Sequence, residues 1–397
     1  MAVEVLKGLR LILSLSSLSD KVYIQTSRFR IPTSLTRILY AIPMNISLTL
    51  ITLFSFDIGF DLKKGSAAIS VMLGISQINL VYAALAMKRS LLMDILRELE
   101  SVVQKRCSNS IDAQEIYQNV EKKNNKLSKN FITFAIIAIC SLFGVPALFP
   151  IFYLCLGFPT PAKWPLPFPF KSFFDPKTYS GFYAPLLVQA ITGITYMGLI
   201  CTLTVLQIGL CSYIKAFTLD LQKQFEYSNS CSNAKRNEAR TKLILKEAIE
   251  LHIDMLNIMH RVKNLLSGPL FFQHITFAGF LAFTLLSLDQ GIHDLSFDIV
   301  LSINCMFTQI LFNYVFSSYA HSLSLCSSGV ADIAYGSLWY TLPINQRDLI
   351  LFTIRRSQIP FYLHGYKIFY CSMQTFQELI RKSFSYFLLF RQLRGVN

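Results

Sequence analysis

Charged side chains are scarce in this sequence. They make up 15% of its 397 residues, whereas 53% of the residues are hydrophobic and Phe alone occurs 33 times. Ordinary soluble domains carry about 25% charged residues, which they need to cover a surface that faces water. The composition therefore excludes an ordinary soluble domain and indicates a polytopic membrane protein.

Acidic residues are scarcer than basic residues. There are 23 Asp and Glu against 37 Lys and Arg, so the formal net charge is +14. A basic balance of this size also suits nucleic acid, but a nucleic-acid binder gathers its Lys and Arg on one polar surface. Here they separate apolar runs, so we expect no nucleic-acid partner and a protein in contact with membrane lipid.

The residue patterns of catalysis and metal binding are missing as well. The six histidines are scattered. His252 and His260 share one predicted helix, but eight residues apart is not the spacing of a metal-ligand pair. We find no glycine-rich phosphate loop and no pair of carboxylates placed for acid-base chemistry within the apolar runs. We therefore expect neither an enzyme nor a bound cofactor or metal.

The nine cysteines do not form a disulfide framework. Six lie in or beside apolar runs, namely Cys140, Cys155, Cys201, Cys211, Cys305 and Cys371, and we expect the other three in the cytosol. The opening run over 9–21 is apolar enough to imitate a signal peptide, but it lacks a clean small-residue cleavage site and basic residues follow it. We interpret it as an amphipathic cytosolic segment.

Long apolar runs are what the sequence has in abundance. Charged residues bound six of them, over 38–56, 65–87, 132–162, 178–214, 264–288 and 299–331. Each is close to or above the roughly 20 residues that cross a bilayer as a helix. The C-terminal run that begins at Thr375 is apolar too, yet it contains Glu378, Arg381 and Lys382. Such charges are costly in lipid, so we expect a seventh membrane helix that faces a water-filled path.

Lys and Arg are unevenly distributed between the connecting segments. They are frequent before the first predicted span, between the second and third, and between the fourth and fifth, and rare in the alternate segments. Because positively charged segments stay in the cytosol, we predict that the N-terminus is inside and the C-terminus outside. The fold class we expect is all-α, with seven transmembrane helices and a helical cytosolic region.

The cytosolic segments themselves carry helical patterns. Apolar residues recur at helical spacing after Ser90 and over 243–262, so the spans are expected to continue as helices into the cytosol. Pro343 and Pro360 bound a further cytosolic helix, whereas six prolines over 159–176 exclude a regular helix in that outside loop. We divide the chain into a cytosolic N-terminal segment (1–37), a six-span bundle with cytosolic extensions (38–331), a cytosolic anchor helix (332–362) and a terminal helix (363–397).

Polar, aromatic and sulfur-containing side chains recur in the outer halves of the predicted spans. Interhelical hydrogen bonding and core packing are the ordinary explanations for such residues. A mostly apolar pocket with a few convergent polar groups is also how proteins bind small lipophilic molecules. On that second interpretation the candidate ligand-binding residues are Met72, Phe143, Ala147, Tyr183, Gln189, Tyr196, Asn304 and Phe307.

The C-terminal third carries an ordered set of motifs. Trp339 and Tyr340 are followed by RRSQIP over 355–360, by Gly365, and then by TFQELIRKSFSYFLLFR from Thr375. In this order they resemble the insect odorant receptor family. The length, the seven predicted spans and the orientation are also similar to that family, while the first 330 residues resemble it only in layout.

The resemblance implies an odorant receptor subunit in the cell membrane, expected on the dendrite of an olfactory neuron. Such a subunit binds a small, volatile, mostly apolar ligand and gates a non-selective cation channel as a heterotetramer with co-receptor subunits. The terminal helix would line a pore that passes monovalent and divalent cations. Alignment of the motif assigns its hydrophobic gate to Leu389 and its narrow-point amide to Gln392, whereas Phe390 and Arg391 beside them depart from the co-receptor pattern.

Two alternatives stay open at this point. A gustatory receptor channel of the same superfamily is the nearer one, although SYFLLFRQLR over 385–394 lacks the Thr-Tyr start that is usual there. A G-protein-coupled receptor also has seven spans, but its opposite orientation would place the basic segments outside the cell. A transporter is disfavoured because the two halves of the sequence show no repeat.

Overall fold

The computed structural model describes residues 33–57, 62–156, 166–167, 178–232, 238–294 and 298–396. The helices, in chain order, are α2 (Thr33–Asp57), α3 (Leu62–Met87), α4 (Arg89–Asn109), α5 (Ile111–Ile139), the π-helix η1 (Cys140–Gly144), α6 (Val145–Leu156), α7 (Tyr179–Ser232), α8 (Glu238–Asp294), α9 (Asp298–Tyr335), the 3₁₀-helix η2 (Trp339–Thr341), α10 (Ile344–Ser357) and α11 (Met373–Val396). The strands β1 (His364–Gly365) and β2 (Phe369–Tyr370) form one short hairpin. The predicted all-α fold class is confirmed.

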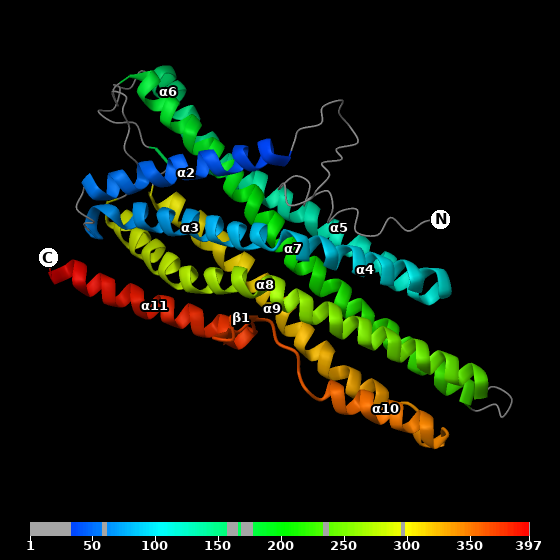
Figure 1. Ribbon diagram of the computed structural model, residues 1–397. Coiled ribbons are helices and arrows are strands. Elements are labelled where there is room, and N and C mark those ends of the chain that lie inside the picture. The colour runs from blue at the N-terminus through cyan, green and yellow to red at the C-terminus, as the bar shows by residue number, and fades with distance from the viewer. Residues whose placement is uncertain are drawn as a thin grey trace, which may run out of the picture.

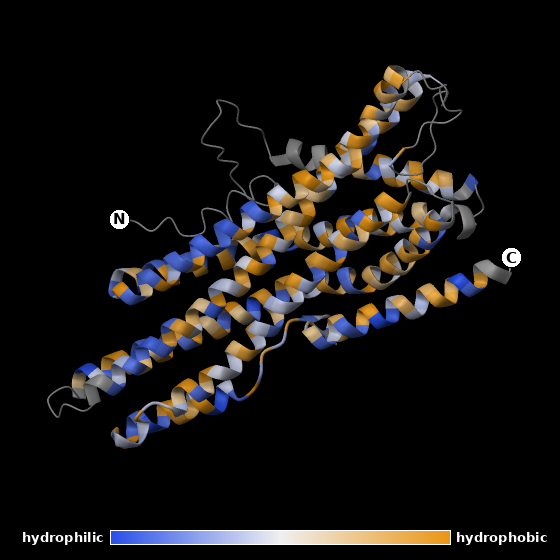
Figure 2. Cartoon of the chain, turned by 180° about the vertical axis from the view of Figure 1, so that it is seen from behind, coloured by the Kyte–Doolittle hydropathy of each residue, from blue (hydrophilic) through white to orange (hydrophobic). Residues whose placement is uncertain are grey.

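Two helices run the length of the molecule (Figure 1). The helix α7 has 54 residues and α8 has 57. At about 1.5 Å per residue each is roughly 80 Å long, against about 30 Å of hydrocarbon in a bilayer. Both helices therefore extend well beyond the membrane, as the helical spacing over 243–262 predicts. Figure 2 shows the same change along the bundle, since orange residues dominate the half near the C-terminus and blue residues the opposite end.

Within the described residues, four helices are long and apolar enough to cross a membrane. These are Gly65–Met87, Ile111–Phe152, Gly181–Asn229 and Ala239–Ile292, and Met44–Ser55 is a shorter apolar helix. The chain is therefore a multi-pass membrane protein. The count of seven spans and the placement of the two termini stay predictions. The N-terminal segment to residue 32 and nearly all of the proline-rich loop over 159–176 lie outside the described residues.

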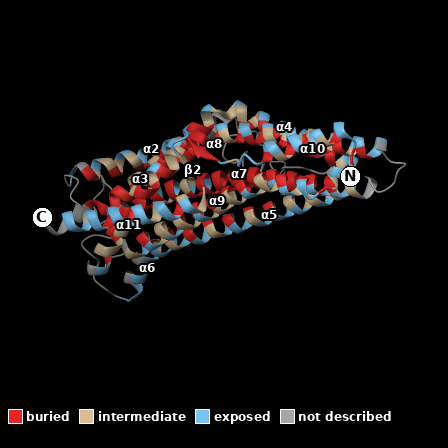
Figure 3. Cartoon of the chain, turned by 90° about the horizontal axis from the view of Figure 1, so that it is seen from below, coloured by how far each residue is buried: buried red, intermediate tan, exposed pale blue. Residues whose placement is uncertain are grey.

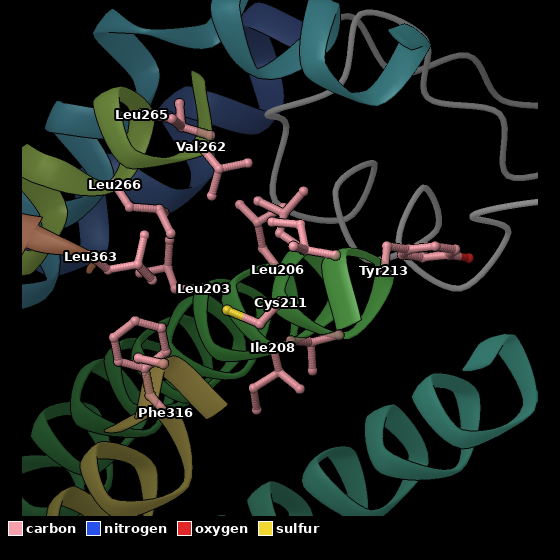
Figure 4. Close-up of a cluster of buried hydrophobic side chains, with 14 of the residues drawn as sticks. Leu203, Leu206, Ile208, Cys211, Tyr213, Val262, Leu265, Leu266, Phe316 and Leu363 are labelled. Atoms are coloured by element: carbon pink, nitrogen blue, oxygen red, sulfur yellow. The ribbon is translucent and has the colours of Figure 1, made fainter. Parts of the chain in front are cut away.

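The main hydrophobic core lies where α7, α8 and α9 cross. Leu206, Leu266 and Phe316, one from each helix, are at most 2% exposed. Leu363, from the segment before β1, packs into the same cluster, which Figure 4 shows from the side. Figure 3 shows buried residues concentrated on these central helices, while α11 lies at the edge with a largely exposed outer side. The core therefore holds α11 only through its inner face.

A buried ion-pair cluster holds four helices together at the end of the bundle that the sequence predicts to be cytosolic. Arg106 on α4 donates from Nε and Nη2 to the Asp220 carboxylate on α7, at 2.9 and 3.0 Å. The Tyr117 hydroxyl on α5 donates to Asp220 Oδ2 at 3.2 Å, and Arg106 Nη1 reaches Glu247 on α8 at 3.1 Å. Burial, and then the charge of Asp220, raise the pKa of Tyr117 well above its ordinary value, so this hydroxyl remains a donor.

The helix predicted between Pro343 and Pro360 is present as α10, and a hairpin that the sequence did not predict follows it. Tyr366 and Lys367 are the central residues of its turn, with positive φ angles of 44° and 64°, as a type I′ turn requires. The Ile368 N–H closes the turn on the Gly365 carbonyl at 2.9 Å, and three residues lie between the paired Gly365 and Phe369. The ring of Phe369 stacks on His274 of α8, with 4.2 Å between ring centroids. The hairpin thus fixes the start of α11 against the middle of α8.

Candidate functional site

A small, almost wholly apolar cavity lies in the half of the bundle nearer the C-terminus. Its volume is about 60 Å³. It is lined by residues of α3, the α5–η1 junction, α7, α8 and α9: Val71, Gly74, Ile75, Ile139, Leu142, Phe143, Thr192, Gly193, Tyr196, Met197, Phe280, Asn304, Cys305, Thr308 and Gln309. A water molecule occupies about 30 Å³ in the liquid, so this space holds roughly two waters.

One wall of the cavity depends on an irregular turn and a glycine. The π-helix η1 interrupts the helix between α5 and α6 and carries Phe143, which is 7% exposed. A π-turn inserts one extra residue and so re-aims the side chains around it. The Phe143 ring lies against Gly193 of α7 so closely that a Cβ atom at Gly193 would collide with it. Phe280 of α8 packs in the same way on Gly74 of α3, where an added Cβ would be 2.9 Å from its ring.

The polar groups of the cavity are already bonded to one another across helices. Gln309 Nε2 on α9 donates to the Tyr196 hydroxyl on α7 at 2.8 Å. Asn304 Nδ2 on α9 donates to Ser141 Oγ on η1 at 3.0 Å. These bonds satisfy groups that would otherwise cost free energy in a dry site. A bound ligand with a hydroxyl or carbonyl group would have to share or replace them.

The sequence-predicted site residues divide into two groups. Phe143, Tyr196 and Asn304 line the cavity. The other five do not. Gln189 is 2% exposed on α7, Met72 Sδ accepts a weak hydrogen bond from Thr52 at 3.8 Å, and the Ala147 carbonyl accepts one from the Tyr183 hydroxyl at 3.4 Å.

Phe307, the fifth of these, lies on the outside of the bundle. It is 57% exposed and borders a separate apolar groove of about 350 Å³ between α5 and α9. Its ring centroid is 6.0 Å from that of Phe134. The groove and the cavity share Asn304 and Thr308 of α9, so the two spaces are neighbours.

Sequence reasoning missed the small residues of the site. Gly74 and Gly193 shape the walls, and Phe280 closes the side opposite Phe143. The available signal was a glycine within a helical run. Gly lowers helix stability by up to about 1 kcal/mol relative to Ala, so a glycine there suggests that close packing requires it. Gln309 is a polar residue within the predicted span over 299–331, and the structure reveals its hydrogen bond to Tyr196.

The terminal helix α11 has a packed face and an open face. Ser383 and Phe387 are buried, and Phe387 packs on Ala282 and Leu286 of α8. On the other face Leu389 is 51% exposed, and Gln392 is also exposed. The two are three residues apart and so share one side of the helix.

Phe390 and Arg391 turn away from that open face and toward α8. The Phe390 ring stacks on Phe283 with 4.8 Å between centroids. Arg391 Nη2 pairs with Asp289 Oδ1 at 3.5 Å. Arg381 and Lys382, by contrast, are exposed. Within the described residues no group of three or more His, Cys, Asp or Glu side chains is arranged to hold a metal ion.

These features define a class first: an all-helical, multi-pass membrane protein with a small apolar cavity and a terminal helix that has one open face. Comparison with known proteins then identifies the family. The family model for the 7tm odorant receptor matches residues 71–384, so the chain belongs to that family. It is a family of receptors and not of enzymes, and the resemblance inferred from the C-terminal motifs is confirmed.

Individual relatives are more distant. The odorant receptor Or2 of Anopheles gambiae is 24% identical over 153 residues, which cover 38% of this chain and 39% of that receptor. The match therefore spans about two fifths of the relative's length. The solved structure of the insect olfactory receptor OR5 from Machilis hrabei superposes with a TM-score of 0.72 at 14% identity, over 98% of this chain and 97% of that chain. Its structure in complex with eugenol gives a TM-score of 0.73 at 12% identity over the same shares. At such identities the likeness shows the fold.

Proposed function

We propose that this chain is the ligand-specific subunit of an odorant-gated, non-selective cation channel, assembled with co-receptor subunits as a heterotetramer. The single observation that carries the proposal is the apolar cavity with Tyr196, Gln309 and Asn304 on its walls. An apolar space with a few oriented polar groups suits a small volatile molecule. The eugenol complex of the OR5 receptor supports a ligand of this chemical class.

The cavity must enlarge to accept such a ligand, because it holds only about 60 Å³. Phe143 and Phe280 are the walls that we expect to move, since each ring lies against a glycine of the facing helix. Movement of either ring would displace α3 or η1 relative to α7 and α8. Ligand binding is thereby coupled to the arrangement of the helices that carry α11.

The open face of α11 supports its assignment to a pore. The exposed amide of Gln392 is costly in lipid and suits a path that holds water between subunits, where it would offer amide oxygens to a cation. Leu389, on the same side of the helix, would block ions there by dewetting. Exposed Arg381 and Lys382 on each of four identical subunits would repel cations. We therefore favour a mixed tetramer over a homotetramer.

The functional test is an odorant panel applied to cells that express the chain with and without a co-receptor. We expect ligand-dependent cation currents only with both subunits. Phe143→Ala and Tyr196→Ala should shift the ligand concentration for half-maximal current by roughly tenfold, because each removes a wall of the cavity. Phe152→Ala, at an exposed position on α6, is the matched control. If neither cavity variant changes the response to any active ligand, the ligand binds elsewhere.

The pore assignment has its own test. Leu389→Ser should raise the current in the absence of ligand while surface expression stays normal, since a hydroxyl wets an apolar constriction. Gln392→Ala should alter ion permeation without moving the ligand dose response. Leu388→Ser is a suitable control, because Leu388 is similarly exposed at 42% but projects about 100° around the helix. Normal basal current in Leu389→Ser at normal surface level would remove this residue from the gate.

A further inference from the structure

The apolar groove between α5 and α9 is larger than the candidate ligand cavity beside it. Its volume is about 350 Å³, against about 60 Å³ for the cavity. Small-molecule sites commonly measure roughly 300 to 1,000 Å³, so the groove has room for a ligand that the cavity cannot hold without enlarging. We call it the lateral groove, and its lining residues are Phe134, Ile137, Ala138, Ser141, Val300, Ile303, Asn304, Phe307 and Thr308.

The lateral groove opens on the outside of the bundle at the depth of the predicted hydrocarbon. All of its lining residues fall within the predicted membrane spans over 132–162 and 299–331. Ile137 is 62% exposed, and Ile303 on the facing helix is 48% exposed. Apolar side chains left exposed within a span lose nothing against lipid tails, which are as apolar as they are. The groove is therefore reached from the bilayer rather than from water.

The polar lining residues of the groove lie where it meets the cavity. Asn304 and Thr308 line both spaces. Ser141 lines the groove and accepts a hydrogen bond from Asn304 Nδ2 at 3.0 Å. This bond joins η1 to α9 at the place where the two spaces meet. A single neutral hydrogen bond contributes little net stability, so it can open and close as the helices move.

A lipophilic ligand meets this groove before it meets the cavity. Transfer of apolar surface from water into hydrocarbon is favourable, so such a molecule accumulates in the bilayer. A hydroxyl or carbonyl group on the ligand is left unpaired there, which costs free energy. On the cavity side of the groove the Asn304 amide can pass its hydrogen bond from Ser141 to that group. The groove thus supplies apolar walls together with a first polar contact.

We propose that the lateral groove is the route by which a small lipophilic ligand passes from the bilayer into the cavity, and that the Asn304–Ser141 hydrogen bond closes this route between passages. The inference rests on the proposed function, since it takes the cavity as the place where the ligand acts. It also gives Phe307 a role, because its exposed ring borders the route without bordering the cavity.

The test separates a route from a binding site by kinetics. A residue that lines only the route changes the barrier equally for entry and exit, and it cannot shift the binding equilibrium because it does not touch the bound ligand. Cells that express the chain with a co-receptor receive a concentration jump, and the rates of current rise and of decay after washout are measured. The probe is eugenol or, where eugenol is inactive, the most active compound of the odorant panel. It is applied below its half-maximal concentration, so that ligand arrival limits the rise.

The decisive variant fills the groove from its exposed side. Ile137→Trp should slow both the rise and the decay by roughly fivefold or more, because overpacking the passage raises a barrier that enters the rate exponentially. The half-maximal concentration should stay within about twofold of the wild-type value. The matched control is Ile136→Trp, at the preceding residue of α5, which is 56% exposed and does not line the groove. It should leave both rates unchanged. Phe307→Ala widens the groove and should speed both rates.

Unchanged rates in Ile137→Trp and Phe307→Ala, at normal surface level, would show that the ligand arrives by another path. A shift in the half-maximal concentration with only one of the two rates changed would make the groove part of the binding site, and the route would be wrong. Loss of surface expression in Ile137→Trp but not in Ile136→Trp would place a partner subunit over the groove and would also overturn the route. A wild-type chain that gives no current with any odorant would refute the proposed function itself, and the route would fall with it.

Discussion

The two halves of α7 and α8 are packed by different kinds of interaction. In the half with the ligand cavity, the contacts between helices are aromatic rings on glycines and neutral hydrogen bonds such as Tyr196–Gln309. In the opposite half, the helices are joined by the charged hydrogen bonds of Arg106 with Asp220. Separating a buried charge from its partner costs much more than breaking a neutral hydrogen bond.

The difference suggests that the two halves of α7 and α8 have different roles. On the proposed function, the half with the cavity would change shape when a ligand enters, and the half with the Arg106–Asp220 pair would stay fixed. The β1–β2 hairpin docks on α8 between the two regions, where Tyr366 packs beside Gly268 and Phe369 on His274. We therefore propose that a shift in the cavity half of α8 is passed to the start of α11.

The largest effect is expected when the buried ion pair of Arg106 with Asp220 is broken. Arg106→Met leaves Asp220 buried without its cation, which typically costs about 3 to 5 kcal/mol. We expect a large fall in the unfolding temperature of the purified protein and little surface expression. Arg97→Met is the matched control on α4, because the Arg97 side chain is 67% exposed in its pair with Asp94. A stable, normally expressed Arg106→Met protein would show that the cluster is not what holds this end of the bundle together.

A smaller effect in the same region depends on pH. His252 of α8 is buried against α10, with Nε2 3.2 Å from Ser357 Oγ. Burial, and to a lesser degree Arg356, lower the pKa of His252 to about 4 from 6.5. The unfolded chain takes up this proton more readily than the folded chain. The stabilisation is therefore complete above about pH 6.5, is lost as the pH falls toward 4, and amounts to at most about 3 kcal/mol.

This prediction is checked by the unfolding temperature between pH 7 and pH 4. His252→Gln should flatten the pH dependence relative to the wild type. His260→Gln, at an exposed position two turns further along α8, should leave it unchanged. An identical pH profile in wild type and His252→Gln would mean that other groups control acid stability.

The helices beyond the predicted membrane spans could be predicted from the sequence better than the cavity. Charge boundaries and helical spacing predicted the long cytosolic extensions, and Pro343 and Pro360 bounded α10 within three residues of its ends. These features are local, so one segment of sequence is enough to reveal them. The hairpin was not predicted, because neither Tyr366 nor Lys367 prefers a positive φ. Its turn is held by packing on α8, which no local pattern records.

The cavity shows the same limit. Phe143, Tyr196 and Asn304 are residue types that stand out within a span, and all three border the cavity. Met72, Ala147, Tyr183, Gln189 and Phe307 lie at comparable depths by counting residues, but they do not border it. Periodicity gives a residue's depth and face only approximately, and the π-turn at η1 changes the register between α5 and α6. Which glycine lies opposite which ring is a property of two helices together.

The smallest effect is expected from a substitution at one glycine that packs on an aromatic ring. Gly193→Ala adds a methyl group where the Phe143 ring now lies, so the ring must move into the cavity or away from α7. Gly198→Ala, on the same helix, adds its methyl group to open space. In a helix Ala is favoured over Gly by up to about 1 kcal/mol, so any loss of stability in Gly193→Ala beyond this gain measures the ring contact.

We expect Gly198→Ala to respond to odorant like the wild type. Gly193→Ala should shift the half-maximal odorant concentration by roughly three- to tenfold at normal surface level, which corresponds to about 0.7 to 1.4 kcal/mol. Patch-clamp dose responses with the co-receptor measure this difference. A loss of larger ligands before smaller ones would show that the ring moves inward. Equal responses of the two variants would mean that the Phe143 wall is soft enough to absorb a methyl group and does not select the ligand.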